Sequence, residues 1–393
     1  MPSTTATIAV PASSLAISAG AEDRHVNSST SNTSPTKDDA STRPTFSHMT
    51  YSRAWLKQVA LDNCAIAEKG SYVNPENNQV VNITKAFDQA MKGSIHYHSS
   101  HTFEPPPDSS RNQYSTTFII ANGSSSMQVA SQLLKMQQSN DARDDETNSD
   151  DSQANSEDSQ KTHIGVLNSA SGKTPGGKFF RGTVSQEDQI CRSSLLYPCL
   201  KQFDDRPHHF YFVNQKPKYR NSASACAIFS PHVPVIRQDS VRASLLAEPL
   251  YQISFCSIPA PNAFVVGPAK LEQDEEKTKR LIPKAQSPGQ GDLGIPHEHI
   301  SLWDSMHDRL FRVLSIFHQH ACQDLVLCAF GCGVHGNNPD SVAQILHELL
   351  TGPFEGCFRN VAFSVAKARP ANFQSFSTHF PGATVWENTE DVV

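Results

Sequence analysis

The sequence contains no apolar run that approaches the roughly 18 residues required for a membrane-spanning helix. The short apolar stretches near its N-terminus lack a basic flank, which argues against a secretory signal. No basic block stands out, and a net charge of −6 gives no general attraction to nucleic acid. We therefore expect no membrane partner and no duplex nucleic-acid partner. We also expect an intracellular location, with cytoplasm and nucleus both open because no clear basic localisation run is present.

The cysteine and histidine patterns provide no complete set of metal ligands. The nine cysteines are an odd number, and several stand in apolar contexts that are typical of buried thiols in a reducing compartment, including Cys226, Cys256 and Cys328. Cys332 follows Cys328 by four residues, but no histidine stands at a spacing that would complete a zinc site. The histidines at 96–101 and 208–209 are expected in exposed loops. The sequence thus predicts neither a metal site nor a cofactor.

Three segments have a composition that is typical of disordered chain. Residues 1–48 are rich in Ser, Thr, Ala, Pro and Asn, with too little apolar material to offset the entropy of ordering. Residues 136–162 are dominated by acidic and amide side chains, and residues 267–296 mix charge with Pro and Gly. We expect a disordered tail, a disordered acidic insertion and a loop insertion. The remainder of 49–385 is expected to form one domain.

Within that domain, short apolar strands alternate with amphipathic helices. Helices are expected at 53–68, 84–93, 125–135, 300–322 and 341–350, with Gly70 as the stop signal of the first. Strands are expected at 80–83, 117–121, 164–167, 210–214, 227–230, 233–236, 252–256, 325–327 and 360–365. This alternation indicates a layered α/β domain with a helical N-terminal extension.

One segment, 166–198, combines an apolar strand end, a Gly176-Gly177 turn and the triplet Gln186-Glu187-Asp188 at a predicted helix start. This order can bring two carboxylates and several backbone N–H groups to one concave spot, which is what a sugar-phosphate ligand requires. Taken alone, Asn168 could equally cap a turn. Gln186 and Glu187 could equally form an ordinary solvated helix start.

A second glycine-rich loop, Gly331-x-Gly333-x-x-Gly336, lies between a predicted strand and a predicted helix. Such a loop lets backbone N–H groups approach phosphate oxygens at a helix N-terminus. A dinucleotide-binding Rossmann site is disfavoured, because the acidic residue expected at the end of the next strand is missing directly after Val365 and only one clear strand comes after the loop. Phosphate binding is favoured over a purely structural glycine turn, and both remain open.

Taken together, these segments resemble the microbial-type poly(ADP-ribose) glycohydrolase family, a branch of the macrodomain superfamily. The matching motifs occur in family order over roughly 51–380: Arg53 with Gly70-x-Tyr72, Leu167-Asn168-x-Ala170-Ser171, Pro175-Gly176-Gly177, Gln186-Glu187, Cys191-Arg192-x-Ser194-x-Leu196-Tyr197, Ser230-Pro231-x-Val233-Pro234, Pro259-Ala260-Pro261-Asn262, and Gly331-Cys332-Gly333-Val334 followed by Asn337 and Pro339. The resemblance implies a three-layer α/β/α macrodomain-like mixed sheet. It also implies hydrolysis of ribose–ribose O-glycosidic bonds, with ADP-ribose or poly(ADP-ribosyl)ated proteins as partners.

The resemblance also implies which residues form the site. Glu187 and Asp188 match the catalytic carboxylates, and Asp188 matches the general acid that protonates the 2′-oxygen leaving group. Contacts to the distal ribose and the diphosphate are implied for Asn168, Gly176, Gly177, Lys178, Gln186, Gly331, Gly333, Val334 and His335.

Three of these positions depart from the family pattern. Lys178 replaces a third glycine, Asp188 replaces a second glutamate, and His335 replaces a phenylalanine. Asp188 keeps the acid but retracts it by roughly 1.3 Å, which could cost on the order of a hundredfold in rate. Lys178 could bind a ligand phosphate or pair with Asp188 and keep it ionised, whereas His335 retains a flat ring. A poly(ADP-ribose) glycohydrolase is the leading hypothesis. A catalytically impaired ADP-ribose reader is the alternative, and hydrolysis of another ADP-ribosyl ester or phosphate is a weaker third.

Overall fold

The computed structural model describes residues 52–147, 163–204, 207–216, 223–240, 242–247, 251–264 and 301–388. The predicted tail at 1–48, most of the acidic insertion and the insertion at 267–296 lie outside these residues. Within the described residues, no helix combines the length and the apolarity needed to span a membrane.

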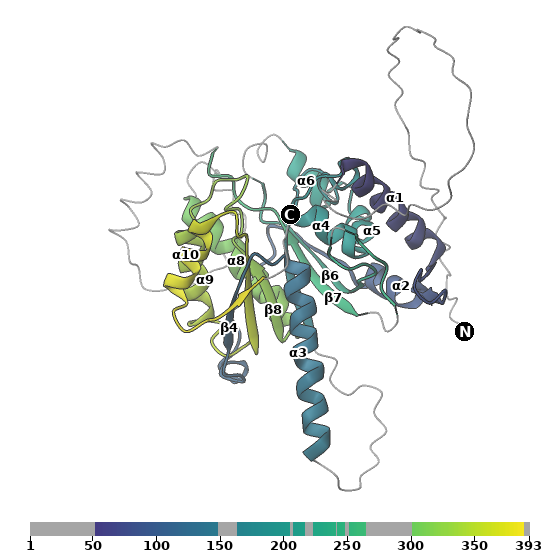
Figure 1. The fold of residues 1–393 in the computed structure, drawn as a ribbon. Coiled ribbons are helices and arrows are strands. Elements are labelled where there is room, and N and C mark those ends of the chain that lie inside the picture. The colour runs from purple at the N-terminus through teal and green to yellow at the C-terminus, as the bar shows by residue number, and fades with distance from the viewer. Residues whose placement is uncertain are drawn as a thin grey trace, which may run out of the picture. The chain divides into compact units, whose positions relative to one another are not determined.

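The described strands form one large mixed sheet and a separate hairpin (Figure 1). Eight of them pair in the order β10-β4-β9-β8-β5-β7-β6-β3, parallel from β10 to β7 and antiparallel from β7 to β3, and β1 pairs with β2. Their bounds are β1 Ser71–Val73, β2 Val80–Asn82, β3 Ile95–Tyr97, β4 Thr117–Asn122, β5 Ile164–Ser169, β6 Ala227–Pro234, β7 Gln252–Ile258, β8 Asp324–Cys328, β9 Asn360–Val365 and β10 Thr384–Glu387.

Helices cover both faces of the large sheet. They are α1 Arg53–Lys69, α2 Thr84–Gly93, α3 Ser126–Thr147, α4 Gln186–Ser193, α5 Leu196–Lys201, α6 Phe210–Gln215, α8 Leu302–Gln319, α9 Pro339–Leu350 and α10 Pro370–His379, with short 3-10 turns η1 Asp108–Ser110 and η2 Phe179–Arg181. The core divides accordingly into two clusters, one under α1 to α6 and one under α8 to α10. Successive strand residues point to opposite faces, so Val326 joins the first cluster while Leu325 and Leu327 join the second. The expected three-layer α/β/α architecture is confirmed.

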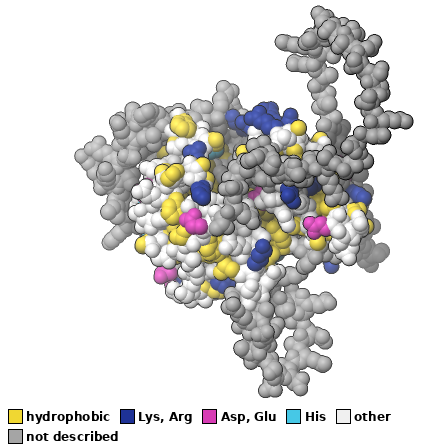
Figure 2. Space-filling view, viewed as in Figure 1, with side chains coloured by type: hydrophobic (Ala, Val, Ile, Leu, Met, Phe, Trp, Pro, Cys, Tyr) yellow, Lys and Arg dark blue, Asp and Glu magenta, His cyan; other side chains and the backbone are white. Residues whose placement is uncertain are grey.

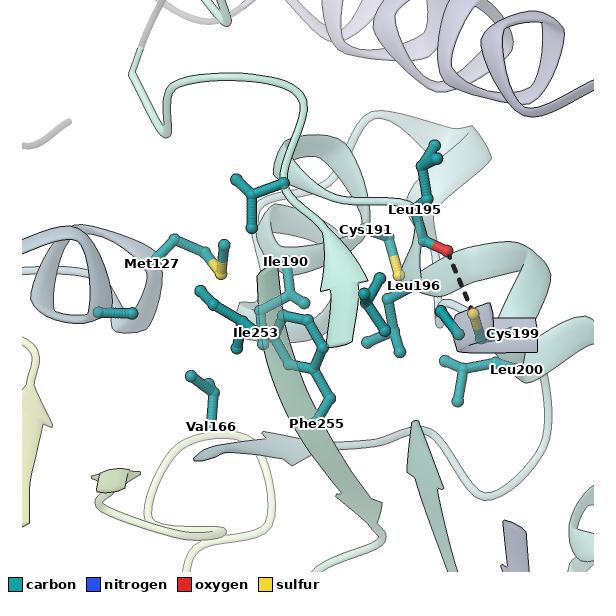
Figure 3. Packing of buried hydrophobic residues seen from close by; sticks show 14 of the residues in the cluster. Met127, Val166, Ile190, Cys191, Leu195, Leu196, Cys199, Leu200, Ile253 and Phe255 are labelled. Atoms are coloured by element: carbon teal, nitrogen blue, oxygen red, sulfur yellow. Dashed lines mark hydrogen bonds between the residues drawn. The ribbon is translucent and has the colours of Figure 1, made fainter. Parts of the chain in front are cut away.

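Figure 3 shows the first cluster, in which side chains from α4 and α5 pack onto the sheet. Ile190 and Leu196 lie near Phe255 of β7, and all three are almost completely buried. This packing fixes the position of α4, the helix whose N-terminus carries Gln186, Glu187 and Asp188.

Helices α1 and α9 begin and end close to the residues that the sequence predicts. Helix α1 begins after Ser52, whose side chain accepts the N–H of Trp55, and ends at Gly70 with a left-handed φ of 71°. Helix α9 begins with Pro339. The preceding residue, Asn338, caps the helix, because its side chain accepts the N–H of Asp340. Both starts satisfy backbone N–H groups that a helix leaves without partners.

Three predicted segments differ from the structure. Residues 210–214, expected as a strand, form helix α6, in which Phe212 is 44 % exposed while its neighbours on either side are buried. The two strands expected at 227–236 are one strand, β6, with a register shift between Ser230 and Val233. Helix α3 continues past 135 to Thr147, into the first part of the segment expected as a disordered insertion, and buried Gln137 donates a hydrogen bond to Asp324 of β8.

The expectation of exposed loop histidines is wrong for His96. This residue lies on strand β3, and its ring is within 6.4 Å of the rings of Phe203, Phe210 and His209. Burial lowers the pKa of His96 to about 4. The ring therefore belongs to the packing beneath α5 and α6, and it is neutral at physiological pH.

Candidate functional site

A cavity of about 1370 Å³ lies at the carboxyl ends of the parallel strands. Its walls come from the segments that directly follow β4, β5, β7, β8 and β9, and from the N-terminal half of α4. Ligands of open α/β sheets bind at this edge, where the loops of neighbouring strands converge. Typical small-ligand cavities measure about 300–1,000 Å³, so this one has room for a dinucleotide. On the face seen in Figure 2, basic side chains lie among acidic and hydrophobic ones.

The first glycine turn brings the backbone directly against the carboxylates. Gly176 and Gly177 have φ values of 65° and 61°, which favour glycine. A Cβ on Gly177 would lie 2.8 Å from Oε2 of Glu187 and 3.3 Å from Oδ1 of Asp188. A side chain at Gly177 would therefore collide with the carboxylate pair. Gly176 itself is buried behind the turn, and it is not among the residues that line the cavity.

Asp188 is held by three hydrogen-bond donors. Its Oδ1 accepts the backbone N–H of Lys178 at 2.9 Å, and its Oδ2 accepts the Thr183 hydroxyl at 2.5 Å and the Ser185 N–H at 3.0 Å. The last contact closes a capping box with Ser185 at the start of α4. Together these contacts fix the orientation of the Asp188 side chain. Lys178 thus binds Asp188 through its backbone, and its own side chain is exposed.

Glu187 lies beside Asp188 in a different environment. It is 3 % exposed; its Oε2 accepts the N–H of Ser171 at 2.8 Å, and its Oε1 has no hydrogen-bond partner. Burial raises the pKa of Glu187 to about 8; the Ser171 N–H and the Asn168 side chain act against that shift, and the charge of Asp188 adds to it. The structure thus places a buried carboxyl group with a raised pKa beside a second acidic side chain that three donors hold.

Asn168 and Gln186 connect this helix start to the sheet. Asn168 is fully buried at the end of β5, where its Nδ2 donates to the Ser257 hydroxyl at 3.0 Å and its Oδ1 has no partner. Gln186 accepts the Ser169 N–H and donates to the Leu167 carbonyl, both at 2.8 Å. Gln186 is therefore a positioning residue that clamps α4 to the end of β5.

The second glycine loop forms the opposite wall. At Gly331, where φ is 70°, a Cβ would overlap the Asn337 side chain. Asn337 in turn donates to the Pro261 carbonyl at 2.9 Å and the Gly331 carbonyl at 3.0 Å. Gly333 has open space around it, and Val334 is 84 % exposed. The clamp by Asn337 thus holds a loop that presents bare backbone to the cavity.

His335 also lines the cavity, and its carbonyl accepts the N–H of Ala263 at 2.9 Å. Burial lowers the pKa of the His335 ring, so its neutral form is favoured. The ring can therefore contact a sugar without bringing a charge into the site.

The sequence analysis missed two groups of cavity residues. Ser171 and Thr183 contact the carboxylate pair, but a serine or threonine in a polar loop gives no distinctive signal. Lys367 and Arg369 follow β9 and line the same cavity, and Arg369 donates to the Cys332 carbonyl at 3.4 Å. Both residues come directly after the buried strand β9, and this position could have indicated that they reach the cavity. Among the described residues, no group of three or more His, Cys, Asp or Glu side chains is placed to hold a metal ion.

The fold and the cavity together define a macrodomain-like protein with a carboxylate pair at the start of α4. A family model described as microbial-type PARG, catalytic domain, matches residues 60–238, which include the first glycine turn and α4. This match bears out the resemblance to the microbial-type poly(ADP-ribose) glycohydrolase family over that part of the chain.

Solved structures similar to this chain are bacterial poly(ADP-ribose) glycohydrolases. The Thermomonospora curvata enzyme is 25 % identical, with a TM-score of 0.58, and the match covers 83 % of this chain and 100 % of that chain. The same enzyme bound to the inhibitor ADP-HPD gives 27 % identity and a TM-score of 0.56 over the same shares. The Deinococcus radiodurans enzyme in complex with ADP-ribose is 23 % identical, covers 75 % of this chain and 97 % of that chain with a TM-score of 0.50, and supports the fold alone. No curated protein sequence matches significantly.

Proposed function

We propose that this protein is a poly(ADP-ribose) glycohydrolase that cleaves the ribose–ribose O-glycosidic bond and releases ADP-ribose. The observation that carries this proposal is the buried pair of Glu187 and Asp188, which stands against a glycine turn in a cavity of dinucleotide size. The match of the family model to residues 60–238 supports it, as does the inhibitor bound to the similar Thermomonospora curvata enzyme.

The ligand would span the cavity between the two glycine loops. Asn168 and Glu187, each with an unpartnered buried oxygen, would receive hydroxyl groups of the terminal ribose. The exposed backbone around Gly333 and Val334 would receive the diphosphate, and the cations Lys367 and Arg369 would balance its charge. His335 would lie against a sugar ring.

Hydrolysis requires a proton for the leaving oxygen. The bond between the anomeric carbon of the terminal ribose and the 2′-oxygen of the preceding unit breaks, and a water oxygen bonds to that carbon. One proton passes from a carboxyl group to the 2′-oxygen, and one passes from the water to a carboxylate. The family pattern gives the acid role to the position of Asp188. Three hydrogen-bond donors hold the Asp188 side chain, whereas burial raises the pKa of Glu187 to about 8, so that Glu187 is protonated at neutral pH.

Two measurements test the proposal: ADP-ribose binding by calorimetry, and release of ADP-ribose from a poly(ADP-ribosyl)ated protein. We expect the unmodified protein to bind and to release. We expect Glu187→Gln and Asp188→Asn each to lose at least a hundredfold in turnover, since a positioned acid or base contributes about 10²–10⁴-fold. Glu104→Gln, which removes an exposed carboxylate, is the control. Absence of binding would refute the site, and binding without release would leave an ADP-ribose reader.

The variants Asp188→Glu and Lys178→Gly test the two departures from the family pattern. Turnover that rises with Asp188→Glu would show that the shorter acid limits the chemistry.

Poly(ADP-ribosyl)ated proteins in the cytoplasm or the nucleus would be the physiological partners.

A further inference from the structure

Segment 178–181, Lys-Phe-Phe-Arg, carries an exposed aromatic ring and two cationic side chains. Phe180 is 39 % exposed, Lys178 and Arg181 are exposed, and all three residues line the cavity. The chemistry of the carboxylate pair uses none of these side chains, because Asp188 takes only the backbone N–H of Lys178. An aromatic face beside cations is a surface on which a nucleic-acid base stacks and a phosphate pairs.

The position of this segment is fixed by the packing around it. Phe179 is 1 % exposed, and the ring of Phe180 stands edge-on to that of Tyr197, with centroids 5.0 Å apart. Gly182 has a φ of 65°, and a Cβ there would overlap the Arg53 carbonyl of α1. The segment is thus pressed against α1 on one side and against α5 on the other. The exposure of Phe180 therefore belongs to a defined surface beside the cavity.

The contacts of the two carboxyl groups place Asp188 on the side of this segment and Glu187 on the side of β5. Asp188 is bound by Lys178, the first residue of the segment, at 2.9 Å and by Thr183, two residues after its end, at 2.5 Å. Glu187 is bound by Ser171, which follows β5 near buried Asn168. If the terminal ribose lies against Asn168 and Glu187, the departing part of the substrate lies toward Asp188 and segment 178–181.

We propose that Lys178, Phe180 and Arg181 form a binding site for the nucleotide on the leaving side of the scissile bond. The departing end of a ribose–ribose linked polymer carries an adenine ring and a diphosphate. The ring would stack on Phe180, and Lys178 and Arg181 would pair with phosphate oxygens. A sugar attached to a protein side chain offers neither group there. The segment therefore selects polymer over a single ADP-ribose on a protein. This inference rests on the proposed function.

The test compares two ligands in the Glu187→Gln background, in which hydrolysis is suppressed. One ligand is ADP-ribose, and the other is the ADP-ribose dimer joined by a ribose–ribose bond. Stacking of one base implies that Phe180→Ala weakens binding of the dimer about tenfold or more while binding of ADP-ribose changes less than about twofold. Phe180→Trp keeps a stacking face and should restore the dimer affinity. The double variant Lys178→Ala/Arg181→Ala should weaken dimer binding and reduce its salt dependence.

Matched controls come from side chains outside the cavity. Phe212→Ala removes a phenylalanine that is 44 % exposed on α6, and Lys57→Ala removes an exposed lysine on α1. Both should leave the two affinities unchanged. Equal weakening of dimer and ADP-ribose by Phe180→Ala, or no weakening of either, would overturn the inference. Failure of the glycohydrolase proposal has a different signature, because the unmodified protein would then bind ADP-ribose without releasing it from polymer.

Discussion

Ionisation of Glu187 should decrease the free energy of unfolding as the pH rises. Glu187→Gln should remove this contribution to the pH dependence of stability. The carboxyl group is buried, and its pKa is raised from 4.5 to about 8. Between these two values the folded protein keeps the proton that the unfolded chain loses. Because the folded state then binds more protons, the free energy of unfolding decreases as the pH increases. This contribution is most favourable below pH 4.5, is lost progressively up to about pH 8, and is constant above it.

The size of the effect follows from the shift. Each pKa unit corresponds to about 1.4 kcal/mol, so a shift from 4.5 to about 8 gives an upper bound of roughly 5 kcal/mol. Glutamine has nearly the same shape and can still accept the Ser171 N–H through its carbonyl oxygen. It carries no charge at any pH, so it does not pay the cost of ionisation in a buried site.

Urea unfolding of the unmodified protein and of Glu187→Gln, measured at intervals from pH 5 to pH 8.5, isolates this term. Other titrating groups far from the site, such as His96, are common to both proteins and cancel in the difference. The stability difference should move in favour of Glu187→Gln by several kcal/mol across this range. Glu104→Gln, at an exposed position, should give a curve parallel to that of the unmodified protein. Parallel curves for Glu187→Gln as well would refute the assignment of a buried, protonated carboxyl group.

Three further substitutions test the geometry of the site. Asp188→Asn leaves at least one of three donors without an acceptor and weakens the cap of α4, so it should lower the free energy of unfolding by about 1–3 kcal/mol, measured by urea titration. Asn337→Ala removes the clamp on Gly331 and should weaken ADP-ribose binding about tenfold in calorimetry, with an unchanged affinity counting against the assignment of the second loop. Gly177→Ala places a methyl group 2.8 Å from Glu187 Oε2 at a positive φ, so turnover should fall at least tenfold, and normal turnover would contradict the geometry.

The sequence predicts best those elements that carry two independent signals. Strand β9 (Asn360–Val365) and helix α9 were expected almost at their observed bounds. In each element a buried apolar run lies next to an Asn or Pro residue that marks its start. The run at 210–214 carries only one signal, apolar content, which a strand and a short helix share. Edge strands such as β10 (Thr384–Glu387) are mostly exposed, and their pairing with β4 depends on tertiary context that periodicity does not encode.

The sequence predicts the part of the site that is formed by side chains and glycine turns. Asn168, Gln186, Glu187 and both glycine loops were expected together. The structure places Gln186, Glu187, Gly177 and the second glycine loop around one cavity, whereas Asn168 and Gly176 are buried and do not line it. The pairing of Asp188 with its neighbours was not predictable, because two of its three donors are backbone N–H groups. Every residue except proline supplies such a donor, so the sequence carries no trace of it.

The conformation of the first glycine turn separates the two departures from the family pattern. Gly176 and Gly177 have positive φ values, whereas Lys178 has a φ of −109°, which any residue adopts. Nothing in the backbone therefore requires glycine at position 178, and its N–H reaches Asp188 whatever the side chain is. Lys178→Gly should accordingly leave the carboxylate pair unchanged. The lysine can act only through its exposed ammonium group on the ligand, whereas a substitution of Asp188 alters the three hydrogen bonds that its side chain accepts.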